Sequence, residues 1–225
     1  MFKFNGISNQ DMNVVVEEES KFIAKASYKY DKNEISGSNG NEYMENGLND
    51  IEISLKLYVL DVNKLDEILS WLNGVGELEY NGRITTARFY SEVLPQRTSS
   101  IRTMDITLIR SPLWHLKNDF QLVKDTESKT NLGNYPSNPI IKLEKTTSKK
   151  LTLQFNDVVF SYTFPDNEDY AILNTEDGNI YYDGLLRNKY LEIDFKYPEM
   201  KVGLNEISIT SGAAKIYLKK KDCWL

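Results

Sequence analysis

Apolar residues recur at every second position over long stretches of this chain. This period of two is the pattern of β-strands that bury one face. From Ile51 to Val59 the odd-numbered residues are all apolar, and the first residues between them are polar. A second run sets Met104, Ile106 and Leu108 against polar neighbours. We therefore expect an all-β fold, built mainly from half-buried antiparallel strands.

One segment departs from this period and has the spacing of a helix. Four apolar side chains of residues 63–73 fall at positions i, i+3, i+4 and i+7, which places them on one helical face. Asn63 is suited to cap the start, and Gly74 is suited to end the helix in the left-handed conformation. We expect a single α-helix over residues 63–73, with a core face made by Leu65, Ile68, Leu69 and Leu72.

The chain of 225 residues is long enough for two domains. The stretch 126–139 contains Gly133, Pro136 and Pro139, and it resembles a connection more than a core element. Beyond it, alternating strands resume without intervening helices, which predicts a second all-β unit, a β-sandwich. We expect an N-terminal β-sandwich with the helix over residues 1–125 and a C-terminal β-sandwich over residues 126–225.

Charge is concentrated in the N-terminal part. Residues 1–92 carry 9 Lys and Arg against 16 Asp and Glu, a net of 9 − 16 = −7, while the remainder nets 18 − 17 = +1. An acidic domain repels a phosphate backbone, which argues against sequence-specific DNA binding. There is no apolar run of membrane-spanning length, and the single Cys223 cannot form an internal disulfide. We expect a protein that folds in a reducing cytoplasm and binds no membrane.

The chemistry-bearing residues predict neither catalysis nor a cofactor. The lone His115 beside a Trp is more typical of a packed structural residue, and one His with one Cys cannot build a structural zinc site. The acidic residues between Asp166 and Asp183 do not have EF-hand spacing, and a solvated hairpin rim accounts for them best. A loop-bound ion or a glycosidase carboxylate pair stays open there. We expect no enzyme, no metal and no catalytic residue.

Several short segments follow one another in a distinctive order along nearly the whole chain. They are Phe4-Asn5-Gly6-Ile7-Ser8, Ile35-Ser36-Gly37-Ser38-Asn39-Gly40, Leu65 to Leu78, Ser111-Pro112-Leu113-Trp114, Gly203 to Ser208 and Trp224-Leu225. In this order they resemble the distal tail protein (Dit) family of siphophages. The resemblance implies an N-terminal β-sandwich with one helix and an extended arm, a galectin-like C-terminal sandwich, and assembly into a hexameric ring.

The chain also departs from the family pattern. Ser36, Ser38 and Asn39 stand where the family commonly has Pro, Arg and Asp in the arm motif, so the interface salt bridge of that arginine is not expected here. A usual Pro-Arg pair near the last strand is replaced by Lys219-Lys220. The basic run that this pair begins is a candidate partner contact, comprising Lys219, Lys220 and Lys221.

The segment 31–50 is the candidate interface. It is rich in Asn and Gly, so it adds little to the core of its own domain, yet it carries apolar side chains with no evident partner. We expect an arm that clasps a neighbouring subunit, and a solvated surface loop is the alternative. Its proposed interface residues are Ile35, Gly37, Gly40, Tyr43 and Met44.

The resemblance implies a structural virion protein. It would form a distal tail ring, or hub, that joins the tail tube to the tail-tip or baseplate proteins and surrounds a channel through which DNA passes. Its place would be the tail tip of a virion assembled in the bacterial host cytoplasm. The alternative function is a carbohydrate-binding adhesion module. We expect protein docking instead, because residues 126–225 contain no His and a single Arg, Arg187, where galectin sugar sites rely on such side chains.

Overall fold

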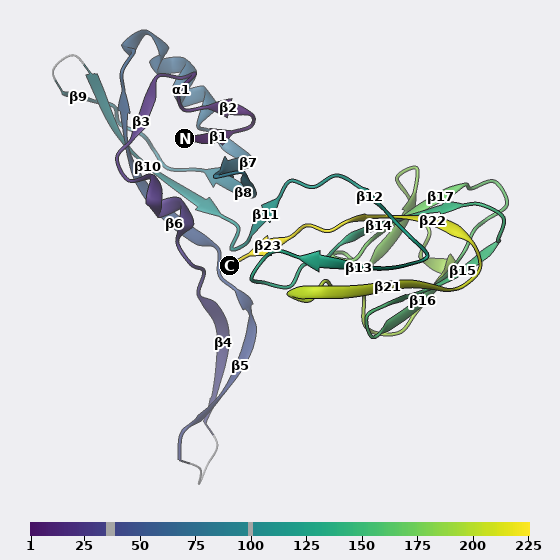
Figure 1. Cartoon of the computed structure of the whole chain (residues 1–225). Coiled ribbons are helices and arrows are strands. Elements are labelled where there is room, and N and C mark those ends of the chain that lie inside the picture. Colours follow the sequence, from purple (N-terminus) through teal and green to yellow (C-terminus); the bar gives the residue numbers. More distant parts are fainter. Residues whose placement is uncertain (35–38, 99–100) are drawn as a thin grey trace. The chain divides into compact units, whose positions relative to one another are not determined.

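The computed structural model describes residues 1–34, 39–98 and 101–225 (Figure 1). The chain divides into two compact units, Met1–Trp114 with Leu225 and His115–Trp224. The boundary falls earlier than residue 125, because β12 (Gln121–Val123) already pairs with β22 (Ala214–Lys219) inside the second unit. Across the described residues the chain is built from strands, with one α-helix, and the predicted all-β class is confirmed.

Unit 1 is built on one antiparallel sheet in the order β2-β1-β7-β8-β10-β6-β3, with β9 paired to β10. We expected a sandwich for this part of the chain, and the structure has one continuous sheet with a helix instead. The strands at both edges of this sheet contribute buried side chains. Its strands are β1 (Phe2–Phe4), β2 (Ile7–Ser8), β3 (Val14–Val16), β6 (Ile51–Val59), β7 (Gly74–Tyr80), β8 (Arg83–Phe89), β9 (Gln96–Thr98) and β10 (Ile101–Arg110).

The alternation read from the sequence marks the buried face of this sheet. Strands β6 and β10 pair so that Leu57 lies opposite Met104 and Leu55 lies opposite Ile106, and all four side chains are buried. Residues between them face outward. The same phase continues to the end of β10, where the buried position is taken by Arg110.

The helix is shorter than predicted. A 3-10 turn, η2 (Val62–Lys64), leads into α1 (Leu65–Trp71). The prediction that Asn63 caps the helix is wrong, because the carboxylate of Asp61 accepts a hydrogen bond from the Asn63 backbone N–H at 3.0 Å. Gly74 does adopt the left-handed conformation, with φ +77°, but it opens β7.

The helix packs against the first strand. Ile68 and Leu72 are buried, whereas Leu65 and Leu69 are half-buried. The buried Trp71 stacks on Phe2, with ring centroids 5.6 Å apart. Its indole N–H also donates to the Phe4 carbonyl at 2.9 Å.

The Asn5-Gly6 pair forms the expected tight turn between β1 and β2. Both residues have positive φ, 51° and 82°. The side-chain oxygen of Asn5 accepts the Glu77 backbone N–H at 3.0 Å. It lies so close to Gly76 that a Cβ there would be 2.1 Å from it. Gly76 is therefore needed for the close approach of Asn5.

Unit 2 is a β-sandwich of two antiparallel sheets, ordered β12-β22-β14-β17-β18-β19 and β13-β21-β15-β16-β20. The remaining short elements of the chain are η1 (Glu19–Ile23), β11 (Trp114–Leu116), η3 (Asn188–Tyr190) and β23 (Cys223–Trp224). The sandwich strands not yet bounded are β13 (Thr126–Asn131), β14 (Ile140–Lys145), β15 (Lys150–Phe155), β16 (Val158–Thr163), β17 (Tyr170–Asn174), β18 (Asn179–Tyr182), β19 (Leu185–Leu186), β20 (Leu191–Ile193) and β21 (Gly203–Ser211).

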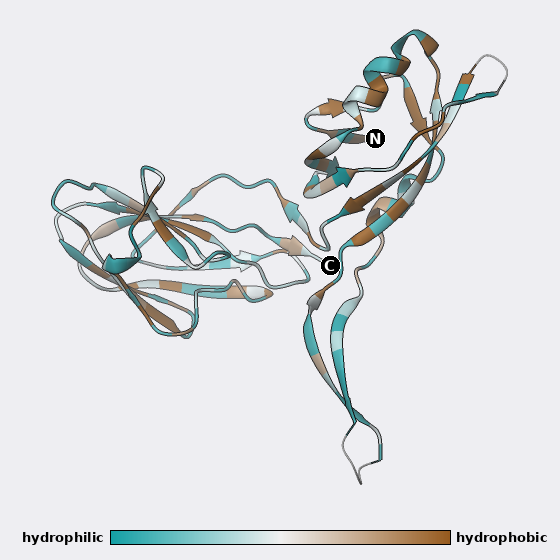
Figure 2. Cartoon of the chain, turned by 180° about the vertical axis from the view of Figure 1, so that it is seen from behind, coloured by the Kyte–Doolittle hydropathy of each residue, from teal (hydrophilic) through white to brown (hydrophobic). Residues whose placement is uncertain are grey.

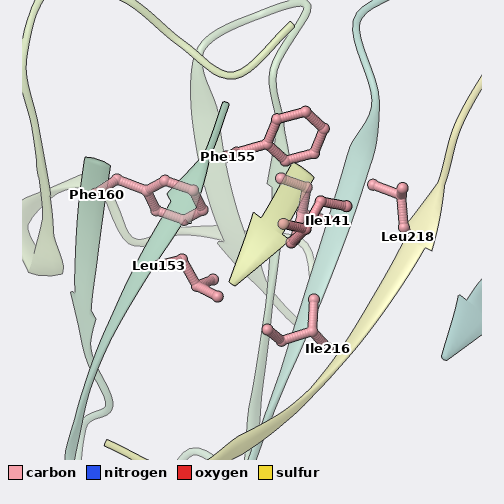
Figure 3. Close-up of a pocket in the computed structure, with 7 residues that line it drawn as sticks. Ile141, Leu153, Phe155, Phe160, Ile216 and Leu218 are labelled. Carbon is pink, nitrogen blue, oxygen red and sulfur yellow. The ribbon is translucent and has the colours of Figure 1, made fainter. Parts of the chain in front are cut away.

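Side chains from both sheets fill the space between them. In Figure 3, Ile141, Ile216 and Leu218 from one sheet point toward Leu153, Phe155 and Phe160 from the other. The gap that these side chains line leaves no room for a water molecule and exposes no polar atom. This interior is a packed core and offers no ligand site.

Candidate functional site

The candidate interface is a two-stranded hairpin, which we call the arm. It consists of β4 (Tyr28–Glu34) and β5 (Asn41–Leu48), and it begins a few residues before the predicted segment 31–50. The two strands pair only with each other, and Figure 1 shows them running side by side. Ile35 and Gly37 lie outside the described residues. Gly40 precedes β5 and has φ +104°, a conformation that favours glycine.

Every residue of β4 is exposed, and so is every residue of β5 before Leu48. Figure 2 shows the arm mainly in hydrophilic colours. Against that background Tyr30, Tyr43 and Met44 keep 60%, 57% and 55% of their surface exposed. A two-stranded hairpin is marginally stable alone in water, so the arm is suited to gain stability from a partner surface.

The register divides the arm into two faces. Tyr30 lies opposite Glu45, and Lys32 lies opposite Tyr43, which places these four side chains on one face. The two tyrosine rings meet edge to face, with centroids 5.5 Å apart. Because successive residues of a strand alternate, Met44 belongs to the other face.

The polar residues of the arm hold its strands together. Asn46 donates to the Asp31 carboxylate at 2.6 Å, and Asn49 donates to the Ser27 hydroxyl at 3.0 Å where the hairpin begins. The Asn-rich composition read from the sequence thus supports a defined ribbon. The apolar groups remain available on its surface.

Arg110 anchors the segment that leads into the arm. Its side chain is buried, and its guanidinium donates to the carbonyls of Ser111, Pro112 and Ala24. Burial lowers the pKa of Arg110 to about 10, so the group stays charged at neutral pH. The alternation of β10 could have predicted the burial of this residue, because position 110 continues the buried phase of Met104.

The basic run near the C-terminus is used within unit 2. Lys219 ends β22. Lys220 donates to the Thr130 carbonyl at 2.8 Å and pairs with the buried Asp222 at 3.0 Å. Lys221 pairs with Glu176 at 2.7 Å. These contacts give Lys220 and Lys221 a structural role, and the partner contact of the basic run stays a prediction.

The acidic residues of unit 2 are also engaged in structure. Glu168 is buried and accepts a hydrogen bond from the Nε of Arg187, and Asp166 pairs with Lys149 at 2.7 Å. Asp177 accepts the Tyr181 hydroxyl at 2.8 Å. Over residues 1–34, 39–98 and 101–225, no group of three or more His, Cys, Asp or Glu side chains could hold a metal ion. The hypothesis of a bound metal ion therefore finds no support in these residues, and the glycosidase alternative stays a hypothesis.

The single histidine and the single cysteine of the chain both have shifted pKa values. Burial lowers the pKa of His115, and burial raises the pKa of the Cys223 thiol to about 12. A thiol that stays protonated at neutral pH is a poor nucleophile.

Among the described residues, none of the helices has the length and apolar character that spanning a membrane requires.

Comparison with known proteins shows which solved structures share this fold. No family model and no curated protein matches the chain. The solved structure of SPP1 Dit (gp 19.1), described as a paradigm of the hub adsorption apparatus in phages that infect Gram-positive bacteria, matches with a TM-score of 0.78. The match covers 100% of this chain and 98% of that chain at 13% sequence identity.

Two structures of the phage P2 baseplate in its activated conformation, one with Ca and one with Sr, match with TM-scores of 0.45 and 0.43. They cover 95% of this chain and 92% of theirs, at 10% and 11% identity. The resemblance stated from the sequence motifs is confirmed at the level of the fold by the SPP1 match. The chain has the fold of a phage distal tail protein.

Proposed function

We propose that this protein is a structural component of a phage tail tip, a hub that joins the tail tube to the tail-tip or baseplate proteins. The observation that carries the proposal is the likeness to SPP1 Dit over the whole chain. At 13% identity that likeness establishes fold alone, so the role must be supported by features of this chain. The arm is the first of these features.

We propose that the arm closes a hexameric ring by clasping a neighbouring subunit. Fully burying a side chain such as Tyr43 or Met44 stabilises an interface by about 1.5–3 kcal/mol. In a ring the same head-to-tail contact is repeated by every subunit, so a modest gain per arm accumulates. A solvated loop, the alternative, would gain nothing from exposed aromatic and thioether groups.

We propose that the ring surrounds a channel through which DNA passes without binding. Six copies carry a formal charge of 6 × −6 = −36, and the acidity lies in the N-terminal residues. A negative wall does not retain a phosphate backbone during passage. Tight binding of duplex DNA at physiological salt, measured by fluorescence anisotropy, would contradict this part of the proposal.

Unit 2 is proposed to dock protein and not sugar. Two tyrosines of β18 make contacts within the chain. Tyr181 donates its hydroxyl to Asp177, and the ring of Tyr182 contacts both the ring of Tyr170 and the guanidinium of Arg187. Calorimetric titration with simple galactosides should give no heat of binding. Millimolar affinity that is lost in Tyr181→Ala would favour the adhesion module.

Negative-stain microscopy and light scattering of the purified protein test the hub proposal. The expected result is closed rings, whose mass is a multiple of the 26.0 kDa chain. Replacing residues 36–47 by a short Gly-Ser turn should reduce the stability of the rings. A protein that stays monomeric at every concentration would overturn the ring. A shortened protein with rings of undiminished stability would overturn the role of the arm.

A further inference from the structure

An open cavity of about 210 Å³ lies on the outward face of the unit 1 sheet. The register places Val75 of β7, Arg88 of β8 and Ile109 of β10 side by side in one row across three neighbouring strands. These strands are labelled in Figure 1. Val75 is 56% exposed, and Arg88 is exposed as well. The row therefore presents a guanidinium flanked by two apolar side chains.

The positive charge that faces this cavity belongs to Arg88. In the described structure, no hydrogen bond or ion pair joins the Arg88 guanidinium to another residue. Arg110 also lines the cavity, but its side chain takes the buried phase of β10 and its guanidinium donates to the carbonyls of Ser111, Pro112 and Ala24, so its charge does not face the opening. Asp50 is the acidic residue of the described lining, and it makes no ion pair with Arg88.

One face of the arm has the complementary chemistry. It presents the edge-to-face pair of Tyr30 and Tyr43 together with Glu45, which lies directly opposite Tyr30. Lys32 lies on the same face, and its charge is paired with Glu34 at 3.3 Å. The carboxylate of Glu45 makes no hydrogen bond or ion pair with another residue of the described chain. An aromatic ring beside a carboxylate matches a guanidinium between two apolar side chains, through a cation–π contact and an ion pair.

The arm cannot reach the cavity of its own chain. Asp50 lines that cavity, and it lies just beyond the end of β5 at Leu48. From Leu48 to Tyr43 the strand runs five residues at about 3.4 Å each, which carries Tyr43 about 17 Å away from the base.

We propose that the face of the arm formed by Tyr30, Tyr43 and Glu45 docks into the Arg88 cavity of a second copy of this chain. The inference rests on the proposed ring and deepens it, because it names the surface that receives the arm. The contact is heterologous, with the arm of one copy bound to the sheet of the next. Such a contact is the kind that closes a ring.

A charge exchange tests the pairing. The variants Arg88→Glu and Glu45→Arg each place like charges in the contact, and the double variant restores an opposite pair. We expect each single variant to raise the concentration at which half of the chains are in rings by at least about tenfold. The double variant should return most of the way to the unsubstituted protein. Light scattering over a dilution series measures all three.

Glu42→Arg is the matched control. Glu42 lies on the same strand and makes the same change of charge, but it faces the other side of the arm. It should leave the midpoint unchanged. Circular dichroism melts verify that the Arg88→Glu variant remains folded, as expected for an exposed residue. Glu45→Arg disrupts the same contact from the arm, where the substitution touches no core.

The outcomes separate the two proposals. If the unsubstituted protein forms rings and Arg88→Glu has the same midpoint concentration for ring formation, the docking site is overturned and the ring proposal stands. Two defective single variants without rescue in the double variant would overturn the direct pairing of Arg88 with Glu45. If the unsubstituted chain forms no rings, the ring itself fails, and the docking site fails with it.

Discussion

The guanidinium of Arg110 lies over the indole of Trp114, 5.0 Å from the ring centroid, and both side chains are buried. Among the described residues no carboxylate pairs with this guanidinium, and backbone carbonyls accept its hydrogen bonds instead. One of them belongs to Ala24, which precedes the arm. A single buried side chain thus ties the end of β10 to the segment that leads into the proposed interface.

Arg110→Met should lower the free energy of unfolding by about 2–4 kcal/mol, because it leaves several carbonyls without a donor. Arg110→Lys should also destabilise, since an ammonium cannot reproduce the planar fork of a guanidinium. Arg102→Met, on the same strand but half-buried, is the control and should change stability by less than about 1 kcal/mol. Urea unfolding measures all three, and equal effects at positions 110 and 102 would contradict the anchoring role.

The sequence was sufficient to predict what short-range periodicity controls. The alternation in 51–59 and 104–108 placed the buried faces of β6 and β10, and the spacing of Ile68 and Leu72 placed the buried side of α1. The cap was predicted at the wrong residue because Asp61 and Asn63 are both capable caps. Asn63 lies inside the 3-10 turn that precedes the helix, so Asp61 takes the cap position of that turn.

The Arg88 cavity could not be predicted in the same way. Val75, Arg88 and Ile109 are far apart in the sequence and become neighbours only when the strand order and register are known. Periodicity identifies the face on which a residue lies, but not which strand pairs beside it. Arg110 was within reach of prediction, because it continues the buried phase of its strand.

Gly76→Ala should destabilise the protein by about 1–3 kcal/mol, since the new methyl group would collide with the Asn5 side chain and displace its hydrogen bond to Glu77. Asn5→Gly keeps the positive φ of the turn and removes the obstacle. In that background Gly76→Ala should cost much less. Thermal melts of the two single variants and the double variant form a cycle. Strictly additive effects would show that the two residues do not interact.

Breaking the pair of Glu168 and Arg187 should be more costly than removing it. Arg187→Met leaves the buried Glu168 carboxylate without its cation and should destabilise by about 2–4 kcal/mol. The double variant Glu168→Met with Arg187→Met removes the stranded charge, so it should recover part of that loss. Chemical denaturation gives both values. Lys149→Met, which removes the exposed pair with Asp166, is the control and should have little effect.

The stability of the protein should fall as the pH decreases through the range where free histidine becomes protonated. The pKa of His115 lies below its ordinary value of 6.5, first because burial disfavours the imidazolium and second because Lys221 repels it, while Glu176 opposes the shift. The unfolded chain therefore binds a proton at this residue before the folded chain does, and the free energy of unfolding declines with falling pH. His115→Gln should flatten the decline between about pH 7.5 and 5.5.

Asp157→Asn is the matched control. Hydrogen bonds from Lys201 and Lys196 lower the pKa of Asp157 to about 2 from an ordinary 3.8. This substitution should therefore alter the profile only in more acidic solution. Parallel urea-unfolding profiles for His115→Gln and the unsubstituted protein across that range would rule out His115 as the source.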